Sequence, residues 1–273
     1  MQQNICRYSL LLAFFLTITI TASKAGNAEN YHVGTFPRLY ILEKLKSHDI
    51  IFLGTTHKNS TILKFISDLI PYLPEAKVTH LGLEISSNQQ NKIDNFLENG
   101  TGLVDIKLHF QIDCPEYRNL IKLTRTLEKN NRPDIVALDL PESMYQKEMS
   151  RDEWMATSIK NAFRFNSHVK MLVVVGNLHV LKNIAWERKS PDHHGFIRSY
   201  LNELTPGLRA FSIGQCINGS PDQCDFTKYF SSVKNAVAVD CDGRFDRWKI
   251  GIMTSVAARP TEISDLLDGL ILY

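Results

Sequence analysis

Residues 50–57 read IIFLGTTH and residues 173–180 read VVVGNLHV, two apolar runs that each end in a glycine, two further residues and a histidine. Short apolar runs bounded by turn residues are typical of strands buried on both faces of a parallel sheet. Amphipathic segments with helical spacing separate these runs, which predicts an α/β fold with a mostly parallel central sheet flanked by helices. The strands are expected at residues 49–53, 78–85, 134–140 and 169–176.

Helix boundaries are marked by capping residues, prolines and glycines. Ser60 is expected to cap a helix that stops at Pro74, and a polar helix is expected to close at Gly100. Pro115 opens a helix that runs to about residue 130, and another begins near Arg151. A C-terminal extension follows, with expected strands at 209–215, 235–240 and 269–273.

The composition is that of an ordinary globular protein. The chain has 273 residues, of which 44% are hydrophobic and 22% charged, and this excludes a disordered, collagen-like or coiled-coil protein. Residues 1–25 contain Arg7 and Lys24 and no acid, so the formal charge of +2 belongs to this segment and the remainder is balanced. We therefore expect no nucleic-acid partner and no attraction to an anionic membrane.

The first 25 residues have the pattern of a secretory signal peptide. One cation, Arg7, precedes the apolar run at 10–20, and small residues follow it up to Ala25, where cleavage is expected, with Ala28 as the alternative. The run is far shorter than the roughly 20 residues that span a bilayer. The sequence thus predicts an exported protein, periplasmic or secreted, that is soluble after cleavage and has one domain at residues 26–273.

Four cysteines remain after the predicted cleavage: Cys114, Cys216, Cys224 and Cys241. Cys216 and Cys224 flank INGSPDQ, a segment rich in turn-forming residues, and export makes a disulfide between them plausible. The alternative is four free thiols. A cysteine zinc site is not expected, because no C-x-x-C spacing occurs.

Polar residues stand where the predicted strands end. His57 and His179 follow two strands, Glu84 is the penultimate residue of a third, and Asp139 closes the fourth. Ligands bind at the carboxyl ends of parallel strands, so these four side chains predict a site at one edge of the sheet. Two alternatives stay open: Asp139 as a turn or helix cap, and Glu84 as a buried acid paired with Arg151 or a lysine.

These residue types suit two kinds of chemistry. His57, Glu84 and His179 could bind a divalent metal, or one histidine could act as general base while the glutamate orients it or activates water. Next to a bound group we expect the residues of the turns and strand ends, namely Gly54, Gly176, Asn177 and Asp139. The remaining histidines are expected to be structural or solvated, with His109 on a helical stretch and His193 and His194 in a loop.

The order of motifs across residues 48–214 resembles the ChaN-like branch of the TraB, Tiki and erythromycin-esterase-like superfamily. The motifs are IIFLGTTH, HLGLE, a long segment ending in DIVALDLP, RDEWMA, VVVGNLHV and GFIRSYLNELTPGLRAFSIG. The resemblance implies an α/β fold with a cleft at the strand ends. For the ChaN-like branch it implies binding of haem or an iron compound at the cell envelope, as part of iron uptake. For other branches it implies hydrolysis, either by a metal-dependent protease or by an esterase that uses a His and Glu pair.

Residue by residue, His57, Glu84 and His179 match the site positions of the superfamily, and Arg151 and Asp152 match its R-D-x-x-M-A motif. The first motif departs from the pattern, because Thr55 stands where an acid is usual. The haem-contacting tyrosine and methionine of the family have no counterpart that can be placed.

Three functions follow from the sequence. The first is an exported ChaN-like protein that binds haem, an iron compound or another small molecule in the strand-end cleft, with a homodimer allowed. The second is a periplasmic hydrolase in which His57, Glu84, His179, Arg151 and Asp152 perform catalysis, with or without a divalent metal. The third is an interaction domain that has lost its chemistry.

Overall fold

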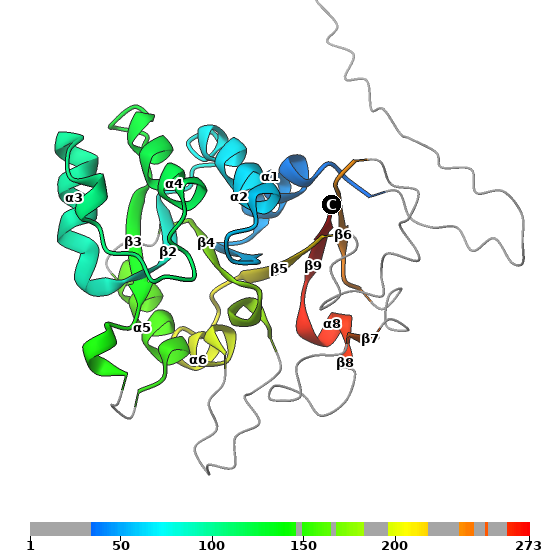
Figure 1. Cartoon of the computed structure of the whole chain (residues 1–273). Coiled ribbons are helices and arrows are strands. Elements are labelled where there is room, and N and C mark those ends of the chain that lie inside the picture. The colour runs from blue at the N-terminus through cyan, green and yellow to red at the C-terminus, as the bar shows by residue number, and fades with distance from the viewer. Residues whose placement is uncertain are drawn as a thin grey trace, which may run out of the picture. The chain divides into compact units, whose positions relative to one another are not determined.

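A seven-stranded sheet organises the fold, in the order β3-β2-β4-β1-β5-β9-β6 (Figure 1). All neighbouring pairs are parallel except β6 and β9, which are antiparallel. The mostly parallel α/β sheet predicted from the apolar runs is therefore confirmed. Its strands are β1 (Ile50–Thr55), β2 (His80–Ser86), β3 (Asp134–Asp139), β4 (Met171–Gly176), β5 (Ala210–Cys216), β6 (Val237–Asp240) and β9 (Gly269–Leu272).

This computed structural model describes residues 34–145, 149–164, 168–182, 196–217, 235–242, 249–250 and 261–273. Residues Thr35–Tyr273 form one compact unit. The predicted signal peptide, Cys224, His193 and His194 lie outside the described residues. Within these ranges no helix has the length and apolar character needed to cross a bilayer.

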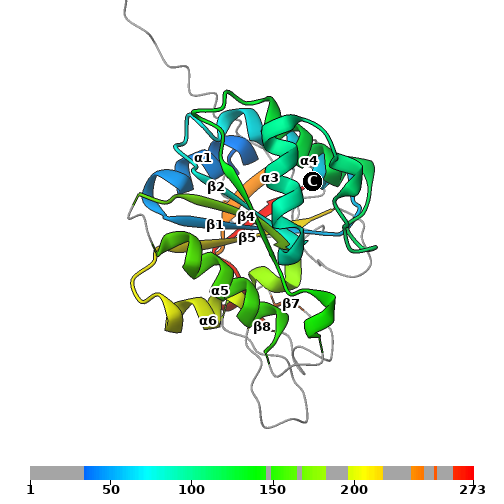
Figure 2. The same ribbon diagram turned by 90° about the vertical axis from the view of Figure 1, so that its left-hand side faces the viewer.

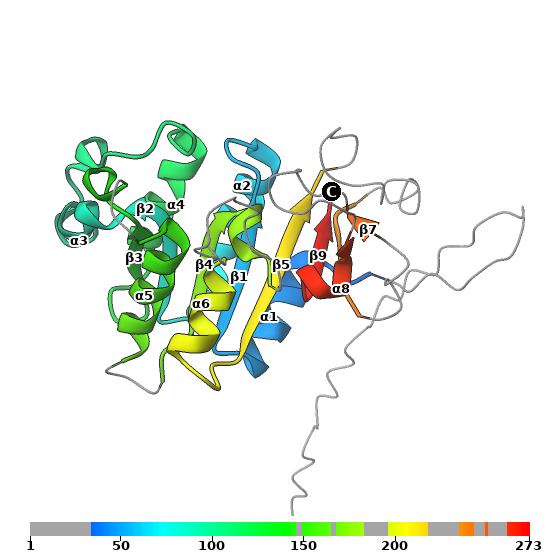
Figure 3. The same cartoon turned by 90° about the horizontal axis from the view of Figure 1, so that it is seen from below.

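Helices cover both faces of the sheet (Figure 2). One face packs against α1 (Pro37–Ser47), α2 (Ser60–Leu69), α3 (Gln90–Asn99) and α4 (Pro115–Thr126). The other packs against α5 (Arg151–Phe163), α6 (Ile197–Leu204) and α8 (Ile263–Leu266), and α5 lies beside α6 (Figure 3). Two small strands, β7 (Lys249–Ile250) and β8 (Thr261–Glu262), pair with each other.

The alternation of side chains along β1 shows why its sequence is apolar throughout. Ile51 and Leu53 contribute to the core under α1 to α4, whereas Ile50 and Phe52 contribute to the core under α5 and α6. All four side chains are fully buried. A strand that is covered on both faces has no polar side to present to water, so the hydrophobic run is continuous.

Two local predictions need correction. Asn59, not Ser60, caps α2: its side chain accepts hydrogen bonds from the backbone N–H groups of Thr61 and Ile62, and Ser60 is the first helical residue. α2 also ends at Leu69 and continues as a short 3-10 turn over Ile70–Tyr72 before Pro74. Gly100 closes α3 with a positive φ of 78°, as its position after the helix predicts.

The cysteines are free thiols where the structure describes them: Cys114, Cys216 and Cys241. Cys216 is buried at the end of β5. The predicted link from Cys216 to Cys224 is therefore not shown, since Cys216 is unpaired and Cys224 is not among the described residues.

Candidate functional site

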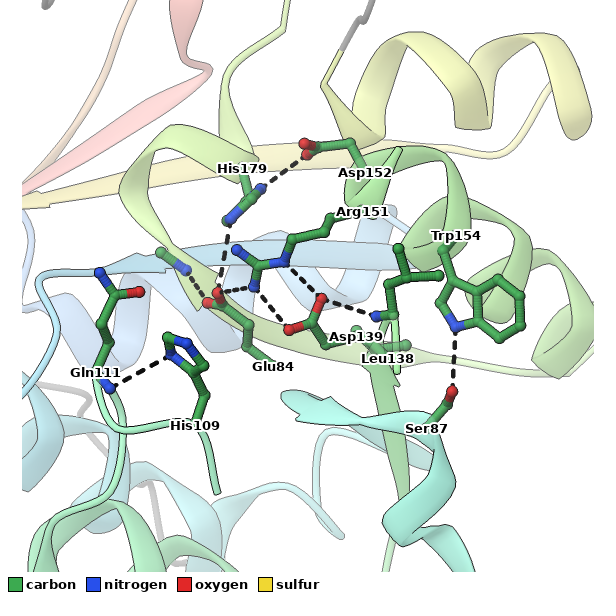
Figure 4. Close-up of polar contacts among 12 residues, drawn as sticks. Glu84, Ser87, His109, Gln111, Leu138, Asp139, Arg151, Asp152, Trp154 and His179 are labelled. Atoms are coloured by element: carbon green, nitrogen blue, oxygen red, sulfur yellow. Dashed lines mark hydrogen bonds and ion pairs between the residues drawn. The ribbon is translucent and has the colours of Figure 1, made fainter. Parts of the chain in front are cut away.

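Four neighbouring strands bring the predicted site residues to one edge of the sheet. The order β3-β2-β4-β1 sets Asp139 at the end of β3, Glu84 near the end of β2, and the turns after β4 and β1 side by side. His179 lies in the first of these turns, the 3-10 segment η5 (Asn177–Val180), and His57 follows the second. Glu84, Asp139, Arg151, Asp152 and His179 point toward one another (Figure 4).

Arg151 joins the two buried carboxylates. Its Nη2 donates to Oε1 of Glu84 over 2.8 Å and to Oδ2 of Asp139 over 2.7 Å, while its Nε donates to Oδ1 of Asp139 over 2.8 Å. Glu84 and Asp139 are 4% and 3% exposed. The pairing of Glu84 with Arg151, one of the alternatives left open by the sequence, is thus what the structure shows.

The other carboxylate oxygen of Glu84, Oε2, also accepts a hydrogen bond. The backbone N–H of Gly176 donates to Oε2 over 2.8 Å. Burial alone would raise the pKa of Glu84, but His179, Arg151 and His57 together lower it below its usual value. The carboxylate is therefore ionised at neutral pH and is the central anion of the site.

His179 is held between two acids. Its Nδ1 lies 2.8 Å from Oδ1 of Asp152, and its Nε2 lies 3.6 Å from Oε1 of Glu84. Burial alone would lower the pKa of His179, but Asp152 and then Glu84 outweigh it and raise the pKa to about 9. The ring is an imidazolium at neutral pH.

His57 has the opposite electrostatic character. Burial lowers its pKa, against the attraction of Glu84, so the ring is neutral at neutral pH. A methyl group added at Gly176 would lie 3.1 Å from Cε1 and from Nε2 of His57, which means that this ring packs on the bare backbone of the neighbouring turn. Its Nδ1 is buried and makes no hydrogen bond within the described part of the chain.

Two of the three predicted metal ligands are already engaged by protein groups. No group of three or more His, Cys, Asp or Glu side chains among the described residues could hold one. Of the three predicted ligands, His179 is protonated and bound to Asp152, and Glu84 is already bound by Arg151 and Gly176. A metal ligand must offer a lone pair, which a protonated imidazole lacks.

Haem iron has the same requirement, and His57 meets it better than His179 does. An axial histidine coordinates through a neutral ring nitrogen. His57 is neutral, whereas His179 is an imidazolium whose two nitrogens face Asp152 and Glu84. Of the two histidines, His57 is thus the one that could bind haem iron.

Asn177 and Gly54 hold the two histidine turns together. Nδ2 of Asn177 donates to the carbonyl of Gln215 over 2.9 Å, and the N–H of Gln215 donates to Oδ1 of Asn177 over 3.1 Å. A Cβ on Gly54 would fall 2.2 Å from Oδ1 of Asn177. The amide of Asn177 is therefore occupied by protein partners, and the predicted contact with a cofactor remains a prediction.

Several residues at the site were not singled out from the sequence. The backbone N–H of Glu84 donates to the hydroxyl of buried Tyr117 over 3.1 Å. Nε1 of Trp154 donates to the hydroxyl of Ser87 over 3.2 Å (Figure 4). In the sequence, Tyr117 stands at helical spacing with apolar residues, a pattern that predicts core packing and nothing more. His109 lies in the loop before α4, not on a helix, and contributes to the low pKa of His57.

Comparison with known proteins relates the chain to others through structure. Neither the family models nor the curated proteins searched contain a match to the sequence. The structure resembles an erythromycin esterase variant in its open conformation, with a TM-score of 0.63 and 12% identity over 86% of this chain and 92% of that chain. It also resembles a succinoglycan biosynthesis protein, with a TM-score of 0.68 and 11% identity over 85% and 89%.

A third similar structure is described as cofacial haem binding to ChaN of Campylobacter jejuni. Its TM-score is 0.51, with 11% identity over 86% of this chain and 91% of that chain. At such identities the likeness concerns the fold. The resemblance drawn from the order of the motifs is confirmed at that level: this chain has the fold of solved structures that include an erythromycin esterase and a ChaN protein.

Proposed function

We propose that this protein is a hydrolase that cleaves an ester or amide bond by acid–base catalysis, without a bound metal. The observation that carries the proposal is the placement of two histidines on adjacent turns around Glu84, with Asp152 bound to Nδ1 of His179 only; this placement lowers the pKa of His57 and raises that of His179. In enzymes that use acid–base catalysis, the surroundings of the catalytic acid and the catalytic base typically push their two pKa values apart.

His57 is the general base of the proposed reaction. Its neutral ring can take a proton from a water molecule as that water attacks the carbonyl carbon of the substrate. Glu84 favours the protonated form of His57, so the proton transfer is stabilised as it happens. The same proton then passes to the leaving alcohol or amine, which completes a hydrolysis whose products are a carboxylic acid and that leaving group.

His179 and Arg151 provide the positive charge of the site. A tetrahedral intermediate carries a negative oxygen, and fixed cations or N–H donors near it lower the barrier by several kcal/mol in typical enzymes. Asp152 keeps His179 protonated, and Asp139 fixes the plane of the Arg151 guanidinium through two hydrogen bonds. Asp152 and Asp139 are positioning residues in this proposal.

The ChaN-like fold makes haem binding the competing function. The charges of the site favour hydrolysis. His179 as an imidazolium and Arg151 in its ion pairs supply positive charge, and His57 is the neutral imidazole that can act as a base. Haem bound through His57 would give a Soret band that the His57→Gln variant loses.

The test uses protein that begins at Gly26, treated with EDTA, and a panel of p-nitrophenyl esters and short peptides. We expect the protein to hydrolyse at least one of these two substrate classes. The His57→Gln and His179→Gln variants should lose this activity, and His80→Gln should keep it. His80 is the matched control, because burial also lowers its pKa but it lies at the opposite end of β2. A Soret band with no hydrolysis, or activity restored only by a divalent metal, would contradict the proposal.

We also propose export, on the pattern of residues 1–25. The intact mass of protein recovered from the cell envelope should correspond to a chain that begins at Gly26. A mass that includes Met1, found in the membrane fraction, would contradict cleavage.

A further inference from the structure

Gln215 of β5 is a buried polar residue that lies between the two histidine turns. Its side chain is fully buried, and Nε2 donates to the carbonyl of Gly54 over 2.5 Å. Its backbone N–H and C=O are both bound to the side-chain amide of Asn177. One residue therefore contacts the first residue of the motif that leads to His57 and the first residue of the turn that carries His179.

β1 and β4, which lead into the two turns, are paired with each other as far as Thr55 and Gly176, but the β1–β5 ladder does not make the connections of Gln215. β1 pairs with β5 only as far as Leu53 and Ile213, and the two strands are not paired at Gly54 or Gln215. Beyond that point the amide of Gln215 and the amide of Asn177 take over the hydrogen bonding that a ladder would provide. A buried amide without partners is unfavourable, so both ends of this side chain need a partner.

Tyr273 completes the network from the far end of the chain. Its hydroxyl donates to Oε1 of Gln215 over 2.5 Å. Burial raises the pKa of Tyr273, so the hydroxyl remains a protonated donor. The carbonyl of Gly54 can only accept, so the NH2 group of the amide faces it, and Oε1 is left to accept from the Tyr273 hydroxyl.

We infer that Gln215 is a positioning residue that holds the turns of His57 and His179 in place beyond the end of the β1–β4 ladder, and that Tyr273 holds its amide there. Among the described residues Gln215 bonds to neither imidazole and acts through Gly54 and Asn177. The inference concerns the placement of the two rings, and its link to turnover rests on the proposed function. A glutamine that served only as core filling would affect stability and leave the rings where they are.

The experiment compares Gln215→Met and Tyr273→Phe with Tyr40→Phe by NMR of histidine rings in full mature protein. His57→Gln and His179→Gln identify the two ring signals. Tyr40 is the matched control, because its hydroxyl is also buried and bonded, to Val239 and Asp240, but it lies on α1 away from both turns. We expect Gln215→Met and Tyr273→Phe to shift the ring signals of His57 and His179, and Tyr40→Phe to leave them unchanged.

Turnover gives a second readout if hydrolysis is found. A displaced base should lower kcat by on the order of 10- to 100-fold with a smaller change in KM. Unchanged ring signals of His57 and His179 in folded Tyr273→Phe would overturn the inference. Shifts in Tyr40→Phe as large as those in Tyr273→Phe would also overturn it. Both tests hold even if Gln215→Met fails to fold. Shifted rings in a protein without hydrolytic activity would leave the inference standing and remove the proposed function.

Discussion

Nδ1 of His179 lies 2.8 Å from the carboxylate of Asp152, and both side chains are buried at the edge of the sheet. Two consecutive residues of α5 therefore act on the site in different ways: Arg151 pairs with the strand-end acids, and Asp152 stabilises the protonated form of the histidine beside them. Ser150 fixes this first turn of the helix by accepting a hydrogen bond from the N–H of Glu153. The R-D pair of the sequence motif thus stands in the first turn of a capped helix.

Replacing Asp152 by Asn should change how stability depends on pH. The folded pKa of His179 is raised to about 9, above its unfolded value of 6.5. The stabilisation is therefore fully present below pH 6.5 and is lost as pH rises through 9, and it amounts to at most about 3 kcal/mol.

Urea unfolding at pH 6, 7.5 and 9.5 measures this effect. The wild type should lose stability between pH 6.5 and 9, and Asp152→Asn should be less stable at pH 6 and flatter over the same interval. Asp68→Asn is the control, because Asp68 pairs with Lys64 on the exposed face of α2. Parallel curves for the wild type and Asp152→Asn would show that Asp152 does not set the pKa of His179.

Arg151→Met should destabilise the fold strongly. It removes the partner of two carboxylates that are almost fully buried, and an uncompensated buried charge typically costs about 3–5 kcal/mol. Lys129→Met removes an ion pair with Glu98 in which both side chains are more than half exposed, and it should change stability little. Equal, small effects of the two variants in denaturant unfolding would contradict the role given to Arg151.

Much of this fold could be predicted from the sequence, because its strands are buried on both faces. A continuous apolar run such as 171–176 marks such a strand without any tertiary information, and the residues that interrupt or follow the runs, Glu84 and His179, stand at the site. Their common edge followed from the parallel arrangement of the strands.

The chemistry of the site was harder to predict, since it depends on partners that are distant in sequence. Glu84 is 67 residues from Arg151, and Gln215 is 58 residues from Tyr273. A metal site at His57, Glu84 and His179 was reasonable from residue type alone. That metal site stays a prediction, and the position of the Arg151 guanidinium between Glu84 and Asp139, and of Asp152 beside His179, could not be foreseen from residue type. No periodic pattern encodes such contacts.

Gly176→Ala should disturb the site more than the fold. The added methyl would approach two ring atoms of His57 to 3.1 Å, closer than ordinary contacts, so the ring has to move by a few tenths of an ångström. We expect kcat to fall by on the order of 10-fold or more, because small displacements of a reacting group are costly.

The control for Gly176→Ala is Gly207→Ala. Gly207 has a φ of 89° and nothing within 4 Å of an added Cβ, so alanine there strains the backbone without touching the site. That variant should lose on the order of 1 kcal/mol of stability and keep full turnover. Equal turnover in Gly176→Ala and the wild type would mean that His57 does not need its position against the turn.

The opposite protonation of His57 and His179 is the central claim, and a histidine NMR titration of EDTA-treated protein tests it most directly. Signals assigned with His57→Gln and His179→Gln are followed from pH 5 to pH 10. We predict that His57 titrates below 6.5 and His179 near 9, so that between these values one ring is neutral while the other is charged. Titration of both rings near 6.5, or of His57 above His179, would contradict the account.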